Sequence, residues 1–119
     1  MSDKARRIGL WALQIDAAGL FLVAGGSKLA GSAQMVQVYA TIGIGQWFRY
    51  LTGGLEVIGA AALLFPATAA LAAVMLAVVM VGAVLAHLFI IGGSPAIPVV
   101  LLLAMATVAW VRRPKEIKS

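Results

Sequence analysis

Long apolar runs fill most of the chain and are broken at only a few places. Four such runs cover residues 8–29, 48–65, 68–91 and 96–111. A helix needs about 20 apolar residues to cross roughly 30 Å of hydrocarbon, so each run predicts a transmembrane helix. The pattern therefore predicts an all-α integral membrane protein, with residues 1–119 forming one domain.

The connections between the runs predict how the helices are arranged. The turns at Phe65–Ala67 and Gly92–Pro95 are short and carry Gly or Pro, which break helices. Short turns force consecutive helices to lie antiparallel. We therefore expect an antiparallel four-transmembrane-helix bundle.

The one long connection, residues 30–47, is not hydrophilic. Ser32 can cap a short helix, and Gly43 and Gly45 would end it. Its apolar side chains recur at helical spacing: Met35, Val36, Tyr39 and Ile42. We interpret this segment as a short interfacial helix that covers the outer mouth of the bundle.

Composition supports the bilayer as the surrounding solvent. The chain is 63% hydrophobic and 11% charged, whereas a soluble domain carries about 45–50% apolar and about 25% charged residues. The first apolar run exceeds the roughly 7–15 residues of a signal-peptide core, so we expect a retained helix. Lipid is the first partner that the sequence predicts.

Charge is concentrated at the two ends of the chain. Seven of the nine basic residues flank the apolar runs: Lys4, Arg6, Arg7, Arg112, Arg113, Lys115 and Lys118. Basic residues mark the cytoplasmic side of transmembrane helices. We expect a multi-pass protein of the bacterial inner-membrane type with both termini in the cytoplasm. No basic stripe with interleaved aromatic residues remains for nucleic acid.

Several kinds of chemistry lack their residues in this sequence. There is no cysteine and one histidine, which excludes thiol catalysis and iron–sulfur clusters and makes a zinc or copper site unexpected. No phosphate-binding loop, dinucleotide fingerprint or Ser–His–Asp order is present. We predict no metal and no certain cofactor.

Ionisable residues inside the apolar runs are the candidate functional residues. They are Asp16, Lys28, Arg49, Glu56 and His87. A charge at the middle of a transmembrane helix costs about 2.5–3.5 kcal/mol, so such residues face the bundle and find partners. Asp16 lies toward the inner end, and the sequence assigns it no role.

The other four residues predict one site beneath the outer connection. Arg49 and Glu56 are seven residues apart and share a helix face, where Gly53 and Gly59 would let a helix or a flat ligand approach. Lys28 and His87 lie near the outer ends of their helices. We predict that Lys28, Arg49, Glu56 and His87 bind a ligand, with Phe21, Met80 and Trp47 lining the site.

Structural roles remain open for each of these residues. Lys28 and Arg49 can extend to the outer interface. Glu56 can be an ion-pair partner that fixes helix register, and His87 can donate a single hydrogen bond.

The chain resembles the DoxX-like proteins. The resemblance rests on Gly25–Leu29, Ile42–Trp47, Arg49–Gly59 and the stretch from Gly82 to His87, in that order and spacing. It implies a four-helix membrane bundle and carries the family's shared polar residues onto Lys28, Glu56 and His87. The family takes its name from a subunit of a thiosulfate:quinone oxidoreductase.

Three functions follow as hypotheses. The first is a membrane subunit or small-ligand-binding bundle associated with an oxidoreductase system, with quinone as a candidate ligand and a redox protein or a second copy as candidate partners. The second is a non-catalytic adaptor or scaffold for a partner protein. The third is a small membrane enzyme using acid–base chemistry of Glu56 and His87. A copurified ligand would separate the second hypothesis from the others.

Overall fold

Helices form the whole of the regular structure in residues 2–113, the part of the chain that the computed structural model describes. In chain order they are α1 (Asp3–Ala30), α2 (Ala33–Ile42), α3 (Trp47–Leu63), α4 (Ala69–Ala86), the π-helix η1 (His87–Ile91) and α5 (Ala96–Val111). No strand occurs in this range. The predicted all-α class is confirmed.

Two of the described helical segments are long and apolar enough to cross a membrane. They are α1, with a mean hydropathy of 1.6, and the continuous segment Ala69–Ile91 of α4 and η1, with 2.8. The α5 helix is apolar but shorter. Only 11% of the apolar window of Ala69–Ile91 is buried, so this segment turns most of its apolar surface outward, as a helix in contact with lipid does.

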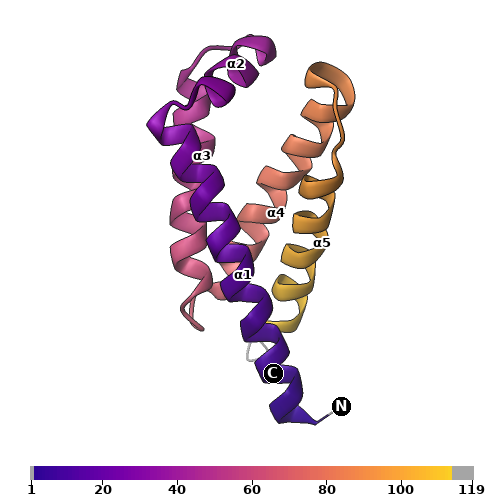
Figure 1. Cartoon of the computed structure of the whole chain (residues 1–119). Helices are drawn as coiled ribbons and strands as arrows, with labels where there is room; N and C mark the ends of the chain where they lie inside the picture. Colours follow the sequence, from indigo (N-terminus) through magenta and orange to yellow (C-terminus); the bar gives the residue numbers. More distant parts are fainter. Residues whose placement is uncertain (1, 114–119) are drawn as a thin grey trace.

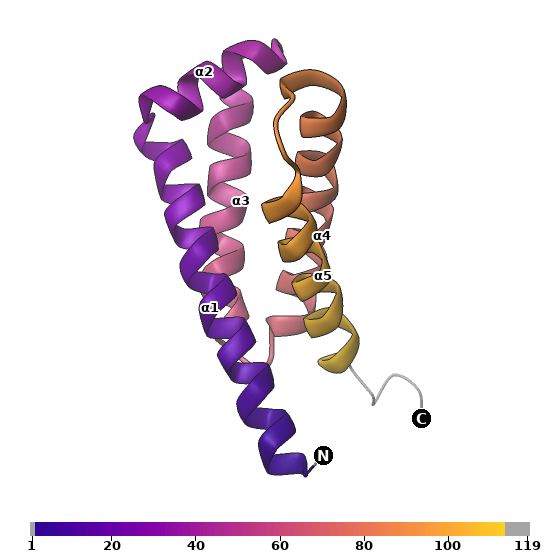
Figure 2. The same ribbon diagram turned by 45° about the vertical axis from the view of Figure 1, so that its right-hand side comes forward.

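The long helices form two pairs that meet at one end. Helix α1 packs along α3, and α4 packs along α5. The pairs lie close at the lower end in Figures 1 and 2 and separate toward α2, which crosses the upper end of the α1–α3 pair. The largest fully buried apolar side chains are Phe21, Leu63, Leu76, Met105 and Val108. In the halves of α4 and α5 nearer to α2, Met80 is the one buried side chain.

Caps set the ends of the first two helices. Ser2 accepts a hydrogen bond from the Ala5 amide (3.1 Å), so α1 begins before the apolar run. Gly31, with φ of 71°, ends α1 in the left-handed conformation that glycine adopts without strain. Ser32 accepts from the Met35 amide (3.3 Å) and starts α2. A sharp corner of two residues therefore joins α1 to α2.

Glycines bring α1 and α3 into backbone contact. A Cβ atom on Gly25 would lie 2.8 Å from the Gly53 carbonyl oxygen, and one on Gly53 would lie 2.9 Å from the Lys28 Cβ. On the same face of α3, a Cβ atom on Gly59 would lie 2.7 Å from Leu76 of α4. Neighbouring helices thus occupy the space beside Glu56 that the sequence left open to a helix or a ligand.

The glycine contact predicts opposite effects of alanine at adjacent positions. Gly25→Ala and Gly53→Ala should each destabilise the protein by about 1–3 kcal/mol, because the new methyl group overlaps backbone. Gly26→Ala and Gly54→Ala should be neutral or stabilising by up to about 1 kcal/mol, because alanine favours the helix and a Cβ meets nothing within 4 Å there. Thermal unfolding in detergent measures all four variants. Equal effects within each adjacent pair would contradict the prediction.

Candidate functional site

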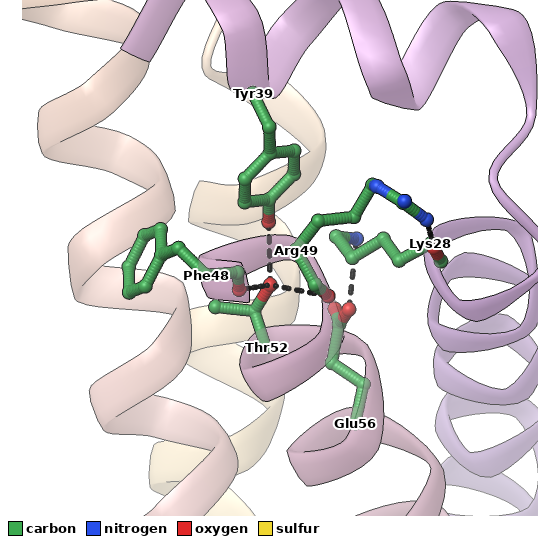
Figure 3. Close-up of polar contacts among 6 residues, drawn as sticks. All are labelled: Lys28, Tyr39, Phe48, Arg49, Thr52 and Glu56. Carbon is green, nitrogen blue, oxygen red and sulfur yellow. Dashed lines mark hydrogen bonds and ion pairs between the residues drawn. The ribbon is translucent and has the colours of Figure 1, made fainter. Parts of the chain in front are cut away.

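An ion pair joins α1 and α3 just beneath α2. The Nζ atom of Lys28 lies 2.7 Å from Oε1 of Glu56, and the Glu56 side chain is 2% exposed while that of Lys28 is 15% exposed (Figure 3). Each residue follows by three positions the glycine of its own helix in the Gly25–Gly53 contact. The contact of the two backbones therefore brings the two charges together.

Arg49 lies in the same cluster but binds the end of a helix. Its side chain is buried, and Nη1 donates to the backbone carbonyl of Lys28 in the last turn of α1, while Nε donates to Gln46 Oε1 at 2.8 Å. The carbonyl end of a helix carries partial negative charge and is stabilised by a cation. Arg49 thus caps α1 and fixes it to the first turn of α3.

Tyr39 joins α2 to this cluster and was not among the predicted site residues. Its hydroxyl lies 2.6 Å from Oγ1 of Thr52, which itself donates to the Phe48 carbonyl at 3.0 Å, so Tyr39 donates to Thr52 (Figure 3). Burial raises the pKa of Tyr39 above its ordinary value, and the hydroxyl keeps its proton. The sequence contained a signal for this contact, because Tyr39 carries a hydroxyl on the apolar face of α2 and Thr52 lies one turn before Glu56.

The structure does not bring His87 to Glu56. Its Nδ1 lies 3.0 Å from the Gly92 carbonyl oxygen, a contact between the start of η1 and the residue that follows it. The depth of His87 along its helix suits the cluster, but the two helix pairs separate toward this end (Figure 2). His87 therefore lies on the opposite side of the gap between the pairs.

The three residues predicted to line the site lie at different depths. Phe21 and Met80 are buried in the core at 0% and 5% exposure. Trp47 is 60% exposed, donates to the Ile44 carbonyl at 2.7 Å and packs edge-on against Phe48. Asp16 is exposed on α1. None of these residues contacts the Lys28–Glu56 pair through a polar group.

An open apolar groove lies between the separated pairs, next to the cluster. Its volume is about 570 Å³, and its walls come from the end of α2, the start of α3, and α4 with η1. Representative lining residues are Ile42, Phe48, Leu85 and Phe89. The Phe48 ring also packs on Tyr39, with ring centroids 5.8 Å apart. Phe48 therefore separates the groove from the polar cluster, which we define as Lys28, Tyr39, Arg49, Thr52 and Glu56.

The polar cluster contains one carboxylate. Among residues 2–113, no three His, Cys, Asp or Glu side chains are grouped so that they could hold a metal ion. The cluster's chemistry is instead that of charge pairing and hydrogen bonding.

Comparison with known proteins adds one match. A family model described as the DoxX-like family matches residues 12–111. The chain belongs to the DoxX-like family. No curated protein and no solved structure matches it significantly. The matched region of this DoxX-like membrane protein runs from α1 to the end of α5 and includes the whole polar cluster, His87 and the groove.

Removal of one charge of the Lys28–Glu56 pair should destabilise the DoxX-like bundle. Lys28→Met leaves a buried carboxylate unpaired, at an expected loss of about 3–5 kcal/mol. Adding Glu56→Leu should restore most of that loss, because an apolar pair of similar size often replaces a buried ion pair without cost. The free energy of unfolding of the single and double variants in detergent checks this.

Lys4→Met is the matched control, since it removes an exposed lysine from the same helix. A double variant as unstable as Lys28→Met alone would show that the two charges do not act as a pair.

Proposed function

We propose that this DoxX-like membrane protein is a small-ligand-binding bundle associated with an oxidoreductase system, and that its ligand is a flat apolar molecule such as a quinone. The observation that carries this proposal is the apolar groove of about 570 Å³ beside the polar cluster. Ligand sites in proteins are concavities of roughly 300–1,000 Å³ with mostly apolar walls and a few polar groups. The groove has that size and apolar walls, and the polar groups nearest to it are those of the polar cluster behind Phe48.

The residues that line the groove can contact the apolar part of such a ligand but offer no side-chain hydrogen bond to its polar ends. Leu85 and Phe89 of the α4–η1 wall and Ile42 of the opposite wall offer apolar contact along the groove. A carbonyl or hydroxyl of the ligand would reach polar side chains only past Phe48, where Tyr39 and Thr52 lie. A bound quinone would supply redox chemistry, and electrons would then have to come from a partner protein.

We further propose that α1, α3, the α4–η1 segment and α5 each cross the membrane and that α2 lies at the outer interface. The described basic residues of both ends of the chain support one orientation, since α1 begins and α5 ends at the end of the bundle away from α2 (Figure 2). These residues are Lys4, Arg6, Arg7, Arg112 and Arg113. Lys115 and Lys118 lie outside the described residues. This end would face the cytoplasm of a bacterial cell.

The adaptor function is the second candidate, and the internal pairing of the polar cluster favours it. Arg49 binds the end of α1, Lys28 binds Glu56, and glycine contacts fill the space beside the carboxylate. Such a cluster would hold the helices together, and the groove would then accept part of a partner protein. The acid–base enzyme hypothesis has no such support, because Glu56 and His87 do not meet.

The orientation predicts the results of two reporter fusions. A reporter fused after Ser119 should report the cytoplasm, because the positive-inside rule places the basic end there. A reporter inserted after Gly43, in the turn that follows α2, should report the external side. A C-terminal reporter on the external side would contradict the proposed arrangement.

The groove predicts the effect of a filling substitution. Ala86→Phe places a ring in the groove and should leave a folded bundle that has lost most of its copurified small molecule. Ala106→Phe, an exposed position on α5, is the matched control and should keep the molecule. Mass spectrometry of solvent extracts from the purified proteins measures the difference. Absence of any small molecule from the parent protein, or equal amounts in both variants, would favour the adaptor function.

A further inference from the structure

A second polar network lies at the opposite end of the bundle, where α1 passes the end of α5. Gln14 of α1 is fully buried, and its Nε2 donates to the Leu63 carbonyl at 2.7 Å. Its Oε1 accepts from Nε of Arg112 at 2.8 Å. The guanidinium of Arg112 also lies over the Trp11 ring, 4.9 Å from its centre. Arg112 is thereby held at a fixed position between α1 and α5.

These contacts place two tryptophans at one level, which in the proposed arrangement is the membrane boundary on this side. Because Arg112 lies over Trp11, Trp11 is level with the end of α5, and the exposed Trp110 lies in the last turn of α5. Tryptophan is enriched at the level of lipid headgroups. Helix α1 continues from Trp11 to Asp3, about 12 Å at 1.5 Å per residue, past the end of α5 (Figure 2).

The continuation of α1 places further positive charge beside Arg112. Arg7 precedes Trp11 by four residues and Gln14 by seven, so Arg7 shares the helix face that meets α5. Arg6 is turned about 100° away from that face. Arg113 lies over the Trp110 ring at 4.0 Å. Together, Lys4, Arg7, Arg112 and Arg113, with Trp11 and Trp110, form what we call the basic patch.

The donors of the basic patch are not used up by acidic side chains. Within residues 2–113, no carboxylate forms an ion pair with Arg7, Arg112 or Arg113. Of the acids near these residues in sequence, Asp3 lies in the first turn of α1 and Asp16 is exposed, while Glu116 lies outside the described residues. The Nη2 atom of Arg112 is buried and has no hydrogen-bond partner in that part of the chain. Buried donors ordinarily have a partner, and a water or an ion accounts for many that have none in the protein.

We propose that the basic patch is a binding site for the phosphate of an anionic phospholipid. Guanidinium groups bind phosphate oxygens through paired hydrogen bonds, and the two tryptophans would contact the glycerol and upper acyl region of the same lipid. The position of the patch at headgroup height, between two apolar helices, favours a lipid over an acidic protein. The lipid would tie α1 to α5 at the end where the two helix pairs meet.

This inference goes beyond the proposed function, because it needs no ligand in the groove. The test uses the full chain purified in a neutral detergent and measures its thermal midpoint and lipid affinity. Phosphatidylglycerol should raise the midpoint by several degrees. Phosphatidylcholine with the same acyl chains, and inorganic phosphate at millimolar concentration, should leave the midpoint unchanged.

The variants distinguish a built site from diffuse attraction. Arg7→Gln should raise the Kd for fluorescent phosphatidylglycerol about fivefold, because one basic residue near an anionic surface contributes about that factor in affinity. Arg6→Gln removes the same charge from a neighbouring face of α1. It should raise the Kd by less than about half of the factor expected for Arg7→Gln. Both positions are exposed, so both variants should remain folded.

Three results would overturn the proposal. They are an equal loss of affinity in Arg6→Gln and Arg7→Gln, the same rise in midpoint with inorganic phosphate, and no rise with phosphatidylglycerol.

Discussion

The approach of α1 to α3 at Gly25 and Gly53 is the contact on which the polar cluster depends. With no Cβ on either residue, the two backbones touch, and Lys28 and Glu56, one turn further along their helices, face each other at 2.7 Å. A carboxylate at this depth is tolerated only when it is paired. Packing of small residues, which drives helix association in membranes, therefore also creates the charge pair. The pair in turn penalises any sliding of one helix along the other.

A second consequence follows at the corner between α1 and α2. Arg49 binds the carbonyl end of α1, and Tyr39 binds Thr52 of α3, so three helices are fixed to one another around the polar cluster. Helix α4 has one comparably close approach to α3, at Gly59 and Leu76, about two turns from Gly53. Between Gly59 and the end of the bundle at α2, no glycine brings α4 as close to α3. The groove thus has one wall of mutually bonded helices and one wall, from α4 and η1, with few polar ties.

The sequence predicted the helices better than it predicted the site. Apolar runs are long-range, redundant signals that sufficed for the all-α class, and four short stretches in order and spacing sufficed for the DoxX-like resemblance. Spacing along α3 correctly put Arg49 and Glu56 on one face. It could not show that the Arg49 guanidinium donates to a backbone carbonyl at the end of α1 instead of pairing with Glu56. His87 was grouped with Glu56 by its depth and by the family's shared polar residues, and neither gives the lateral separation of the two helix pairs. Gln14 and Tyr39 were missed as contacts because their partners lie on other helices, the Leu63 carbonyl and Arg112 for Gln14 and Thr52 for Tyr39, and no spacing along the chain relates them.

The internal satisfaction of the polar cluster changes where a ligand should be sought. Each charged member has a protein partner. Lys28 and Glu56 lie at ion-pair distance, although Glu56 Oε1 has no partner with hydrogen-bond geometry among the described residues, and Arg49 binds both Gln46 and the end of α1. A ligand that displaced these partners would have to offset the free energy lost with a buried ion pair and a helix cap. A ligand in the groove displaces only lipid or water from apolar walls. The polar cluster therefore stabilises one wall of the groove. Selectivity for a ligand should depend on Phe48 and on the α4–η1 wall rather than on Lys28 or Glu56.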